Sequence, residues 1–258
     1  MTDSLKHIFS YKYLLVNLVV KEFKTRYKTA SLGFLWVVLT PLFMMVILSF
    51  VFSKIVRIDV QNFPVFLLCG ILPWSFTSIS LFSVTTSIVD NANLIKKVSF
   101  PKIMIPVSIV CSNGIFFLFS LLILIVFIIF SQIPIRLSLF LIPVVFAIQF
   151  IFILGLSLLA VTLHVRHRDV KYIVELVLLG WFYLTPIFYP ISFVPDRFRG
   201  LYMLNPMASI IVMYRDLLLY AKMVDHNVFI YSLVSSIVLF ILAFVLFQKR
   251  EKNFADVI

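Results

Sequence analysis

Charged residues are scarce in this sequence. Of its 258 residues, 13% are charged and 62% are hydrophobic, whereas a soluble domain is about a quarter charged and about half apolar. This excludes an ordinary water-soluble fold and predicts an integral membrane protein. The net charge of +11 does not indicate nucleic-acid binding, because the basic residues come in short blocks between apolar runs, as in membrane proteins.

Cysteine and glycine are also rare. The two cysteines, Cys69 and Cys111, lie in apolar runs without the spacing of a metal site or a disulfide framework, so both are predicted to be packing residues. The six glycines form no Gly-x-x-x-x-Gly-Lys-Ser/Thr phosphate loop. No cofactor is therefore expected on this chain, and if ATP drives the protein, a separate chain must bind it.

Catalytic constellations are missing too. His164 and His167 lie three residues apart, but neighbouring arginines disfavour a metal site. Glu175, about one turn inside an apolar run, leaves two interpretations open: a structural ion pair with Lys171 or Arg168, or a role in gating. No paired carboxylates and no nucleophile with a base are present, so the sequence predicts no catalytic or metal-binding residue and no enzyme activity of its own.

Six apolar stretches predict an all-α membrane fold, a single domain over residues 1–258. Each stretch approaches or exceeds the ~20 residues that cross the hydrocarbon core as a helix. The fifth is the shortest and carries Pro186 and Pro190 near its end. The predicted spans are 33–53, 64–88, 106–130, 138–163, 172–190 and 228–247.

Lysine and arginine are distributed unevenly between the two sides of these spans. With a cytoplasmic N-terminus, 15 of the 22 basic residues face the cytoplasm and 7 face outward. The positive-inside rule therefore predicts that both termini are cytoplasmic.

Residues 1–31 are predicted to form an amphipathic helix in the headgroup region. A solvated helix of a soluble domain is the alternative, although no such domain follows. Basic side chains gather on one flank of the helix, at Lys21, Lys24 and Lys28. The predicted apolar face consists of Val16, Val19, Val20, Phe23 and Tyr27.

The segment 91–105 is a polar and basic island between the second and third spans. Pro101 disfavours helix at Phe100, so a helical turn over 93–99 is expected to stop there. Pro106 suits the first turn of the next helix. A short basic helix between two spans is typical of a docking surface for a soluble partner.

The outer segment 190–227 is too long for a turn and too apolar for a solvated loop. Pro195 and the pair Asn205-Pro206 predict breaks between two short helices. Met207–Tyr220 is largely apolar but is interrupted by Arg215-Asp216. Apolar stretches of this length are often re-entrant, so the segment is predicted to dip into the outer leaflet around an opening.

The island also carries a recognisable pattern. Asn91-x-x-Leu94-Ile95-x-Lys97-x-x-Phe100-Pro101-Lys102-x-x-x-Pro106 resembles the coupling helix of type-2 ABC transporter permeases that export polysaccharides. Further motifs of this family are matched in order over about 190 residues. They are Arg26-Tyr27 through Leu32-Gly33-x-x-Trp36, Gly70-Ile71-Leu72-Pro73-Trp74, Thr185 through Pro190, Leu204-Asn205-Pro206, and Arg215.

The resemblance implies a transport subunit in the cytoplasmic membrane of a bacterium. Two copies would form a homodimer around a pore, and two copies of a separate ATPase would bind ATP and Mg and dock beneath. The substrate would be a lipid-linked polysaccharide such as O-antigen, capsule or teichoic acid.

The resemblance also assigns residues to four regions. Phe100 is expected to anchor the coupling segment in the ATPase. The ATPase-coupling residues are Leu94, Ile95, Lys96, Lys97, Val98, Ser99, Phe100, Pro101 and Lys102, with Arg168 and Asp169 as a second contact. The entry gate is Lys21, Lys24, Arg26, Tyr27 and Lys28, and the outer segment contributes Arg215 and Asp216.

Aromatic residues make up 16% of the chain and recur at helical spacing. Trp36, Phe43 and Phe50 are seven residues apart, and Trp181–Phe188 and Phe182–Tyr189 have the same interval. Such rings also occur in bundle cores, against lipid, and as anchors at the membrane interface. The family resemblance favours pore-lining rings in the first and fifth spans, namely Trp36, Phe43, Phe50, Trp181, Phe188 and Tyr189.

Three alternatives to this transport function remain open. One is a permease for a small lipid or drug. Another is an ATP-independent flippase, which the lack of a carboxylate in the middle of any span disfavours. The third is a membrane enzyme, which the missing catalytic groups disfavour.

Overall fold

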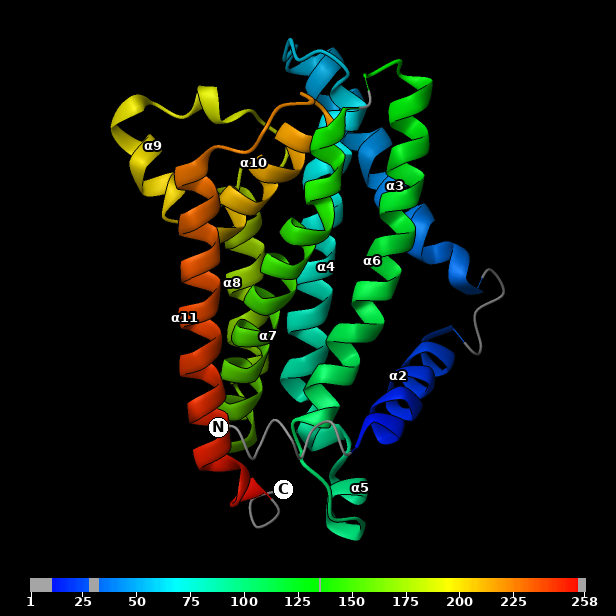
Figure 1. Ribbon diagram of the computed structural model, residues 1–258, viewed down its shortest axis with the longest axis vertical. Helices are drawn as coiled ribbons and strands as arrows, with labels where there is room; N and C mark the ends of the chain where they lie inside the picture. The colour runs from blue at the N-terminus through cyan, green and yellow to red at the C-terminus, as the bar shows by residue number, and fades with distance from the viewer. Residues whose placement is uncertain (1–10, 28–32, 135, 255–258) are drawn as a thin grey trace.

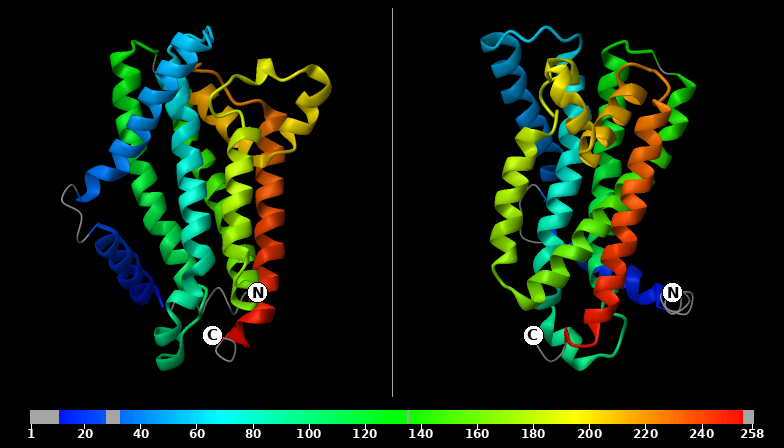
Figure 2. Two further views of the ribbon diagram at one scale, coloured as in Figure 1. Left: turned by 180° about the vertical axis from the view of Figure 1, so that it is seen from behind. Right: turned by 90° about the vertical axis from the view of Figure 1, so that its left-hand side faces the viewer.

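The computed structural model describes residues 11–27, 33–134 and 136–254, and every regular element in this part of the chain is helical (Figure 1). The long helices run roughly along one axis, and short helices cap both ends (Figure 2). In chain order the elements are α2 Lys12–Tyr27, η1 Gly33–Leu35, α3 Trp36–Phe50, η2 Val51–Ile55, α4 Phe63–Asp90, α5 Ala92–Lys97, α6 Met104–Phe130, η3 Leu137–Leu141, α7 Ile142–Arg166, α8 Val170–Leu184, η4 Ile191–Phe193, α9 Asp196–Met203, α10 Pro206–Leu218 and α11 His226–Glu251.

Five helical segments of the described chain are long and apolar enough to cross a bilayer. They agree with the first four predicted spans and the sixth. Their bounds are Trp36–Ile55, Phe63–Asp90, Met104–Phe130, Leu137–Arg166 and His226–Glu251.

The fifth predicted span is shorter than the sequence suggested. Helix α8 ends at Leu184 after 15 residues, and Thr185 is extended, with φ −104° and ψ 136°. Pro186 explains this end, because proline disfavours helix at the residue before it. The prediction of one continuous helix over 172–190 was therefore wrong, although α8 still runs from the end that carries α5 to the end that carries α9 and α10 (Figure 1).

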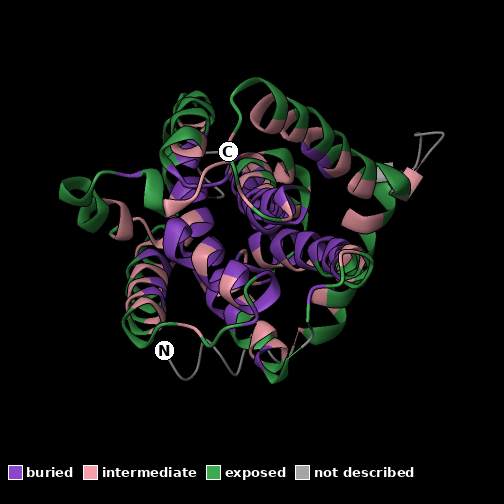
Figure 3. Cartoon of the chain, turned by 90° about the horizontal axis from the view of Figure 1, so that it is seen from above, coloured by how far each residue is buried: buried purple, intermediate pink, exposed green. Residues whose placement is uncertain are grey.

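Helix α4 lies at the centre of the bundle and packs against α3, α6, α7, α8 and α10. Of its most apolar stretch 78% is buried, compared with 11% for Trp36–Ile55. Seen from above, the buried residues gather on the central helices and the exposed residues on the periphery (Figure 3). The bundle therefore has a fixed central frame and helices with largely uncovered faces.

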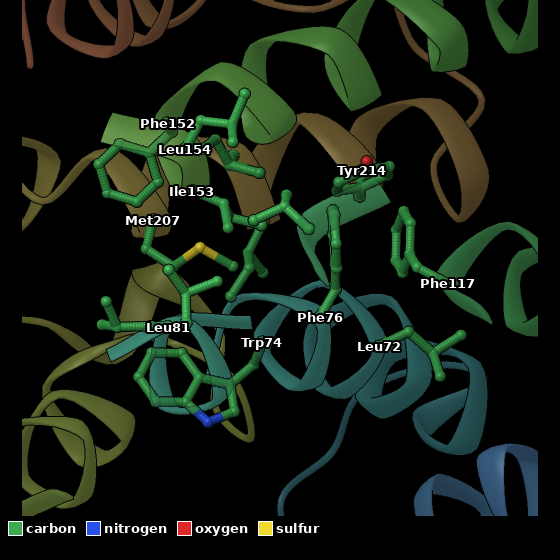
Figure 4. Packing of buried hydrophobic residues seen from close by; sticks show 14 of the residues in the cluster. Leu72, Trp74, Phe76, Leu81, Phe117, Phe152, Ile153, Leu154, Met207 and Tyr214 are labelled. Atoms are coloured by element: carbon green, nitrogen blue, oxygen red, sulfur yellow. The ribbon is translucent and has the colours of Figure 1, made fainter. Parts of the chain in front are cut away.

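Aromatic rings and one polar network hold the frame together. Phe76 of α4 stacks on Phe117 of α6 at 5.1 Å, and Tyr214 of α10 meets Phe117 edge-on (Figure 4). Gln149 of α7 donates to the Pro73 carbonyl at 2.8 Å and accepts from the Tyr214 hydroxyl at 3.0 Å. Because buried polar groups must find partners, this network fixes how α4, α7 and α10 fit together.

The two short outer helices begin where prolines were expected to break the chain. Helix α9 follows Pro195 and is largely exposed, whereas α10 begins at Pro206 and is largely buried against α4 and α11. Asn205 caps α10 by accepting from the Met207 amide at 3.0 Å. The predicted pair of short helices is confirmed, and of the two only α10 is embedded in the bundle.

Candidate functional site

Helix α5 projects beyond the long helices at one end of the molecule (Figure 1). Helix formation stops at Val98, which is extended, as the following Phe100-Pro101 pair predicted. Lys96, Lys97, Val98 and Ser99 are exposed, whereas Ile95 is buried. The segment therefore presents two cations and one apolar side chain outward while Ile95 anchors it to the bundle.

Phe100 does not have the predicted role. Its side chain is 9% exposed and belongs to the hydrophobic core of this chain, so it is not available as an anchor in a partner. Ile95 is buried in the same core. Their burial makes α5 a rigid extension of the bundle, and Val98 is the apolar residue that a partner could contact.

Lys102 was expected to face a partner but contacts the end of α11 instead. Its backbone N–H donates to Glu251 Oε1 at 2.6 Å, and its Nζ donates to the Glu251 carbonyl at 2.7 Å. The Nζ also lies 5.9 Å from the centre of the Phe254 ring. The α5–α6 connection is therefore held by the last turn of α11, a contact that the sequence did not reveal.

Helix α2 contacts the other side of the same segment. Lys21 Nζ donates to Asn91 Oδ1 at 2.9 Å, just before α5 begins. Phe23 stacks on Phe116 of α6 at 4.5 Å. Lys21 and Lys24 are exposed, and Lys21 lies beside the coupling segment. The entry gate at these residues stays a prediction.

Helix α2 packs against the bundle largely through leucines that are not part of its predicted apolar face. Leu14, Leu15 and Leu18 pack against the core, whereas Val16 and Val20 are exposed. Val16 and Val20 belong to the predicted apolar face, and the placement of that face in the headgroup region stays a prediction. The side chains of Arg26 and Tyr27, and all of Lys28, lie outside the described part of the structure.

The loop between α7 and α8 lies at the same end as α5 (Figure 2). Arg168 and Asp169 are exposed, as a second docking contact requires. Glu175 is also exposed, and in the described part of the chain it forms no ion pair within 4.0 Å. The predicted structural pair with Lys171 or Arg168 is therefore not formed, and Glu175 lines an open hollow with Trp74 and Phe182.

The aromatic stripe of α3 has the predicted geometry. Trp36, Phe43 and Phe50 are 48%, 69% and 62% exposed and follow one side of the helix. Of the residues of α3, only Pro41 and Met45 are buried. The stripe is thus an uncovered surface of the protomer.

The second predicted stripe is not formed, because α8 ends before its later members. Trp181 turns inward, meets Trp74 edge-on at 5.6 Å and donates its indole N–H to Asn205 Oδ1. Phe188 stacks on Phe52 at 5.0 Å. Tyr189 shares a 2.7 Å hydrogen bond with Tyr202, and burial raises the pKa of the Tyr189 hydroxyl. These rings fasten the outer segment to the bundle.

A different set of residues forms the exposed face of α8. Tyr172, Leu176, Leu179 and Tyr183 are exposed at positions i, i+4, i+7 and i+11, so they share one side of the helix. Leu178 is the buried residue of this helix. The helical spacing of the two tyrosines was visible in the sequence and was missed.

Arg215 is buried within α10 and organises the outer end. Its two terminal nitrogens donate to the carbonyls of Pro186 and Ile187, each at 2.6 Å, and its guanidinium lies 3.6 Å from the Phe66 ring centre. A Cβ on Gly70 would lie 2.8 Å from the Ile187 carbonyl oxygen. Arg215 therefore holds the chain after α8 against α4. At position 70 of α4, this close approach leaves room only for glycine.

Asp216 follows Arg215 but is oriented differently. Its carboxyl is partly buried near Lys222 and Asp225, and burial raises its pKa to about 6. The side chains of the two adjacent residues therefore have different surroundings. Arg215 is buried in the central frame, and Asp216 is partly buried near Lys222 and Asp225.

A cavity of about 180 Å³ lies between α3, α4 and α6. Trp36 and Ile79 are exposed residues of its wall, and Asn113 is a buried one. Asn113 Nδ2 donates to Ser80 at 3.1 Å, while its Oδ1 has no partner within the described chain. This recess beside the α3 stripe, which is mainly apolar and contains the buried Asn113, was not predicted.

The family model described as ABC-2 type transporter matches residues 13–219. The chain is a member of the ABC-2 type transporter family. Two relatives named O-antigen export system permease protein RfbA are similar over their full length: one of Klebsiella pneumoniae is 32% identical over 260 residues, covering 100% of both chains, and one of Myxococcus xanthus is 34% identical over 259 residues, covering 99% of each.

Membership in the ABC-2 family identifies the chain as a multi-pass membrane subunit of a transporter. The family motifs quoted from the sequence also acquire physical reasons. Gly70 makes room for Arg215 and Ile187, Pro73 provides the carbonyl bound by Gln149, and Asn205 links α8 to α10. The motifs of this ABC-2 permease are thus largely contacts of its frame.

Proposed function

We propose that this chain is the permease subunit of an ATP-driven exporter that moves a lipid-linked polysaccharide across the bacterial cytoplasmic membrane. The observation that carries the substrate class is similarity along the entire chain to permeases named for O-antigen export. Capsule and teichoic acid polysaccharides belong to the same chemical class. A lipid-linked glycan combines a long hydrated chain with an apolar anchor, and both must pass the membrane.

The pore in this proposal is formed by two copies of the chain. Helices α3 and α8 lie on either side of α4 and leave large apolar and aromatic faces uncovered (Figure 2). Sugar rings have apolar C–H faces, so aromatic walls can carry a hydrated chain without binding one unit tightly. Pairing of two protomers through these faces would enclose such a wall.

Force in this proposal enters through α5. Two copies of a separate ATPase, with ATP and Mg, would dock beneath, and Lys96 and Lys97 suit an acidic groove. Val98 replaces Phe100 as the apolar contact, and the buried Ile95 and Phe100 pass movement to α4 and α6. The contacts Lys21–Asn91 and Lys102–Glu251 extend this movement to α2 and α11.

The proposed orientation places α5, both chain termini and the α7–α8 loop in the cytoplasm. The excess of basic residues at this end supports it through the positive-inside rule. The cations that lie there include Lys24, Lys96, Lys97, Arg168 and Lys249.

Charge reversal at α5 tests this function. Lys96→Glu with Lys97→Glu should abolish copurification of the ATPase and reduce polysaccharide export to background, because two attractive contacts become repulsive. Surface glycan is measured by immunoblot and the ATPase by pull-down from membranes. Lys249→Glu with Lys252→Glu is the matched control at the same end and should leave both readouts unchanged. Normal export by the α5 variant, at wild-type levels of inserted protein, would refute the docking site.

A further inference from the structure

A second cavity lies at the end of the molecule that carries α5, between the last turns of α7 and α11. Its volume is about 470 Å³. Arg166 and His167 line it from the side of α7, and Arg250 and Phe254 line it from the side of α11. It is separate from the uncovered α3 and α8 faces, and neither the transport path nor the α5 surface uses it.

The charges of this cavity are of one sign. No acidic residue lines it, and within the described chain neither Arg166 nor Arg250 has a carboxylate within 4.0 Å. Glu251, which follows Arg250 in the sequence, is engaged with the backbone N–H of Lys102. Two arginines from different helices therefore line a space that no acidic residue of the described chain lines. Guanidinium groups bind phosphate oxygens in paired hydrogen bonds.

The apolar residues of the cavity wall indicate which kind of phosphate-bearing molecule would fit. Leu163 and Leu246 line the cavity, and Leu242, one turn of α11 further into the membrane span, is exposed. A cationic recess directly below exposed leucines suits a molecule with an anionic head and an apolar tail. Basic pockets between transmembrane helices on the cytoplasmic side are known to take acidic lipid headgroups.

We infer that this cavity is a binding site for the headgroup of an anionic phospholipid from the cytoplasmic leaflet. Arg166 and Arg250 bind the phosphate, and the acyl chains lie against Leu163 and Leu242. The assignment to this leaflet rests on the proposed orientation. Since Glu251 next to Arg250 holds Lys102, the bound lipid would also fix the end of α11 against the coupling segment.

Lipid retention by the purified complex tests the site. The permease and its ATPase are purified in detergent, incubated with phosphatidylglycerol or phosphatidylcholine, and the lipid bound per protomer is measured by native mass spectrometry. Phosphatidylglycerol should be retained and phosphatidylcholine should not. Arg166→Gln with Arg250→Gln should weaken retention about thirtyfold, because each basic residue contributes about one kcal/mol. The control pair Lys249→Gln and Lys252→Gln removes the same charge and should retain the lipid.

Four results would overturn the inference. Equal retention by the arginine variant, or equal loss by the control, would mean that no specific site exists or that diffuse charge is responsible. Displacement of the lipid by millimolar inorganic phosphate would mean that the site takes a soluble anion. Loss of the ATPase from the arginine variant with unchanged lipid would make the cavity a protein contact. Export by the Lys96→Glu, Lys97→Glu variant is measured separately, so failure of the lipid site and failure of the transport function remain distinguishable.

Discussion

Helices α4 and α8 are neighbours of similar apolar character, yet α4 is largely buried in the bundle and α8 is largely exposed. The most apolar stretch of α4 is 78% buried, whereas α8 has one buried residue, Leu178. In a bilayer an exposed leucine costs nothing, so hydrophobicity does not decide which helix is central. Small and polar residues do, because they allow close approach and interhelical hydrogen bonds. Gly70 and Thr77 play these parts in α4.

Two glycine substitutions test this difference in packing between α4 and α8. The one in α4, Gly70→Ala, has the largest expected effect. Gly70→Ala places a Cβ 2.8 Å from the Ile187 carbonyl oxygen and 3.1 Å from the Arg215 guanidinium. Overpacking of this kind costs about 1–3 kcal/mol, and here it also loosens the buried Arg215 contacts. We expect a melting temperature several degrees lower and much less folded protein in membranes, measured by fluorescence-detected chromatography after heating.

The matched control lies in the uncovered helix. A Cβ at Gly180 meets nothing within 4 Å of the described chain, and alanine favours helix over glycine by about 1 kcal/mol. Gly180→Ala should therefore melt at or slightly above the wild-type temperature. Equal destabilisation by both variants would show that α8 is as tightly packed as α4 and would remove the distinction between frame and face.

An intermediate effect is expected where the frame meets the coupling segment. Glu251→Ala removes the acceptor for the Lys102 backbone N–H, so the last turn of α11 should no longer hold the α5–α6 connection. We expect export to fall several-fold while the ATPase still binds and hydrolyses ATP. Export per ATP hydrolysed, measured in reconstituted vesicles, checks this.

The isosteric variant Glu251→Gln keeps an acceptor oxygen at the same position and should transport close to the wild-type rate. If Gln behaves like Ala, the charge of Glu251 matters rather than the hydrogen bond, and the mechanical link is wrong.

The sequence predicted the parts of this fold that depend on local chemistry. Apolar length located five spans, and Pro101, Pro195 and Pro206 located breaks, because proline acts on its immediate neighbours. Partners distant in sequence were not predictable: Phe100 is buried by other helices, and Lys102 is held by Glu251, 149 residues away. The error at α8 was different: apolar length extended the predicted span to residue 190, although Pro186 ends the helix at Leu184.

The candidate functional residues show the same difference between features set by local sequence and contacts that depend on distant residues. The exposed cations of α5 and the α3 stripe required only a helix and a surface, and both have the predicted geometry. The packing of α2 through Leu14, Leu15 and Leu18 was not predicted, because a bilayer accepts Val16 and Val20 outside as readily as Leu18 inside. The recess at Asn113 depends on three helices meeting, which no single stretch of sequence encodes.

The smallest expected effect concerns whether the uncovered face of α3 needs rings or only apolar volume. Phe43 is the most exposed member of the stripe. Phe43→Leu keeps an apolar side chain and removes the ring, whereas Phe43→Tyr keeps the ring. A weak contact to an aromatic face is worth roughly 0.5–1 kcal/mol, so export by the Leu variant should be about two- to fivefold slower and export by the Tyr variant close to normal. Initial export rates of labelled glycan, at matched protein levels, measure this. If Leu exports normally while a polar residue such as Phe43→Ser does not, the stripe packs against a partner or lipid rather than against sugar, and the pore wall must be sought on α8, at Tyr172 and Tyr183.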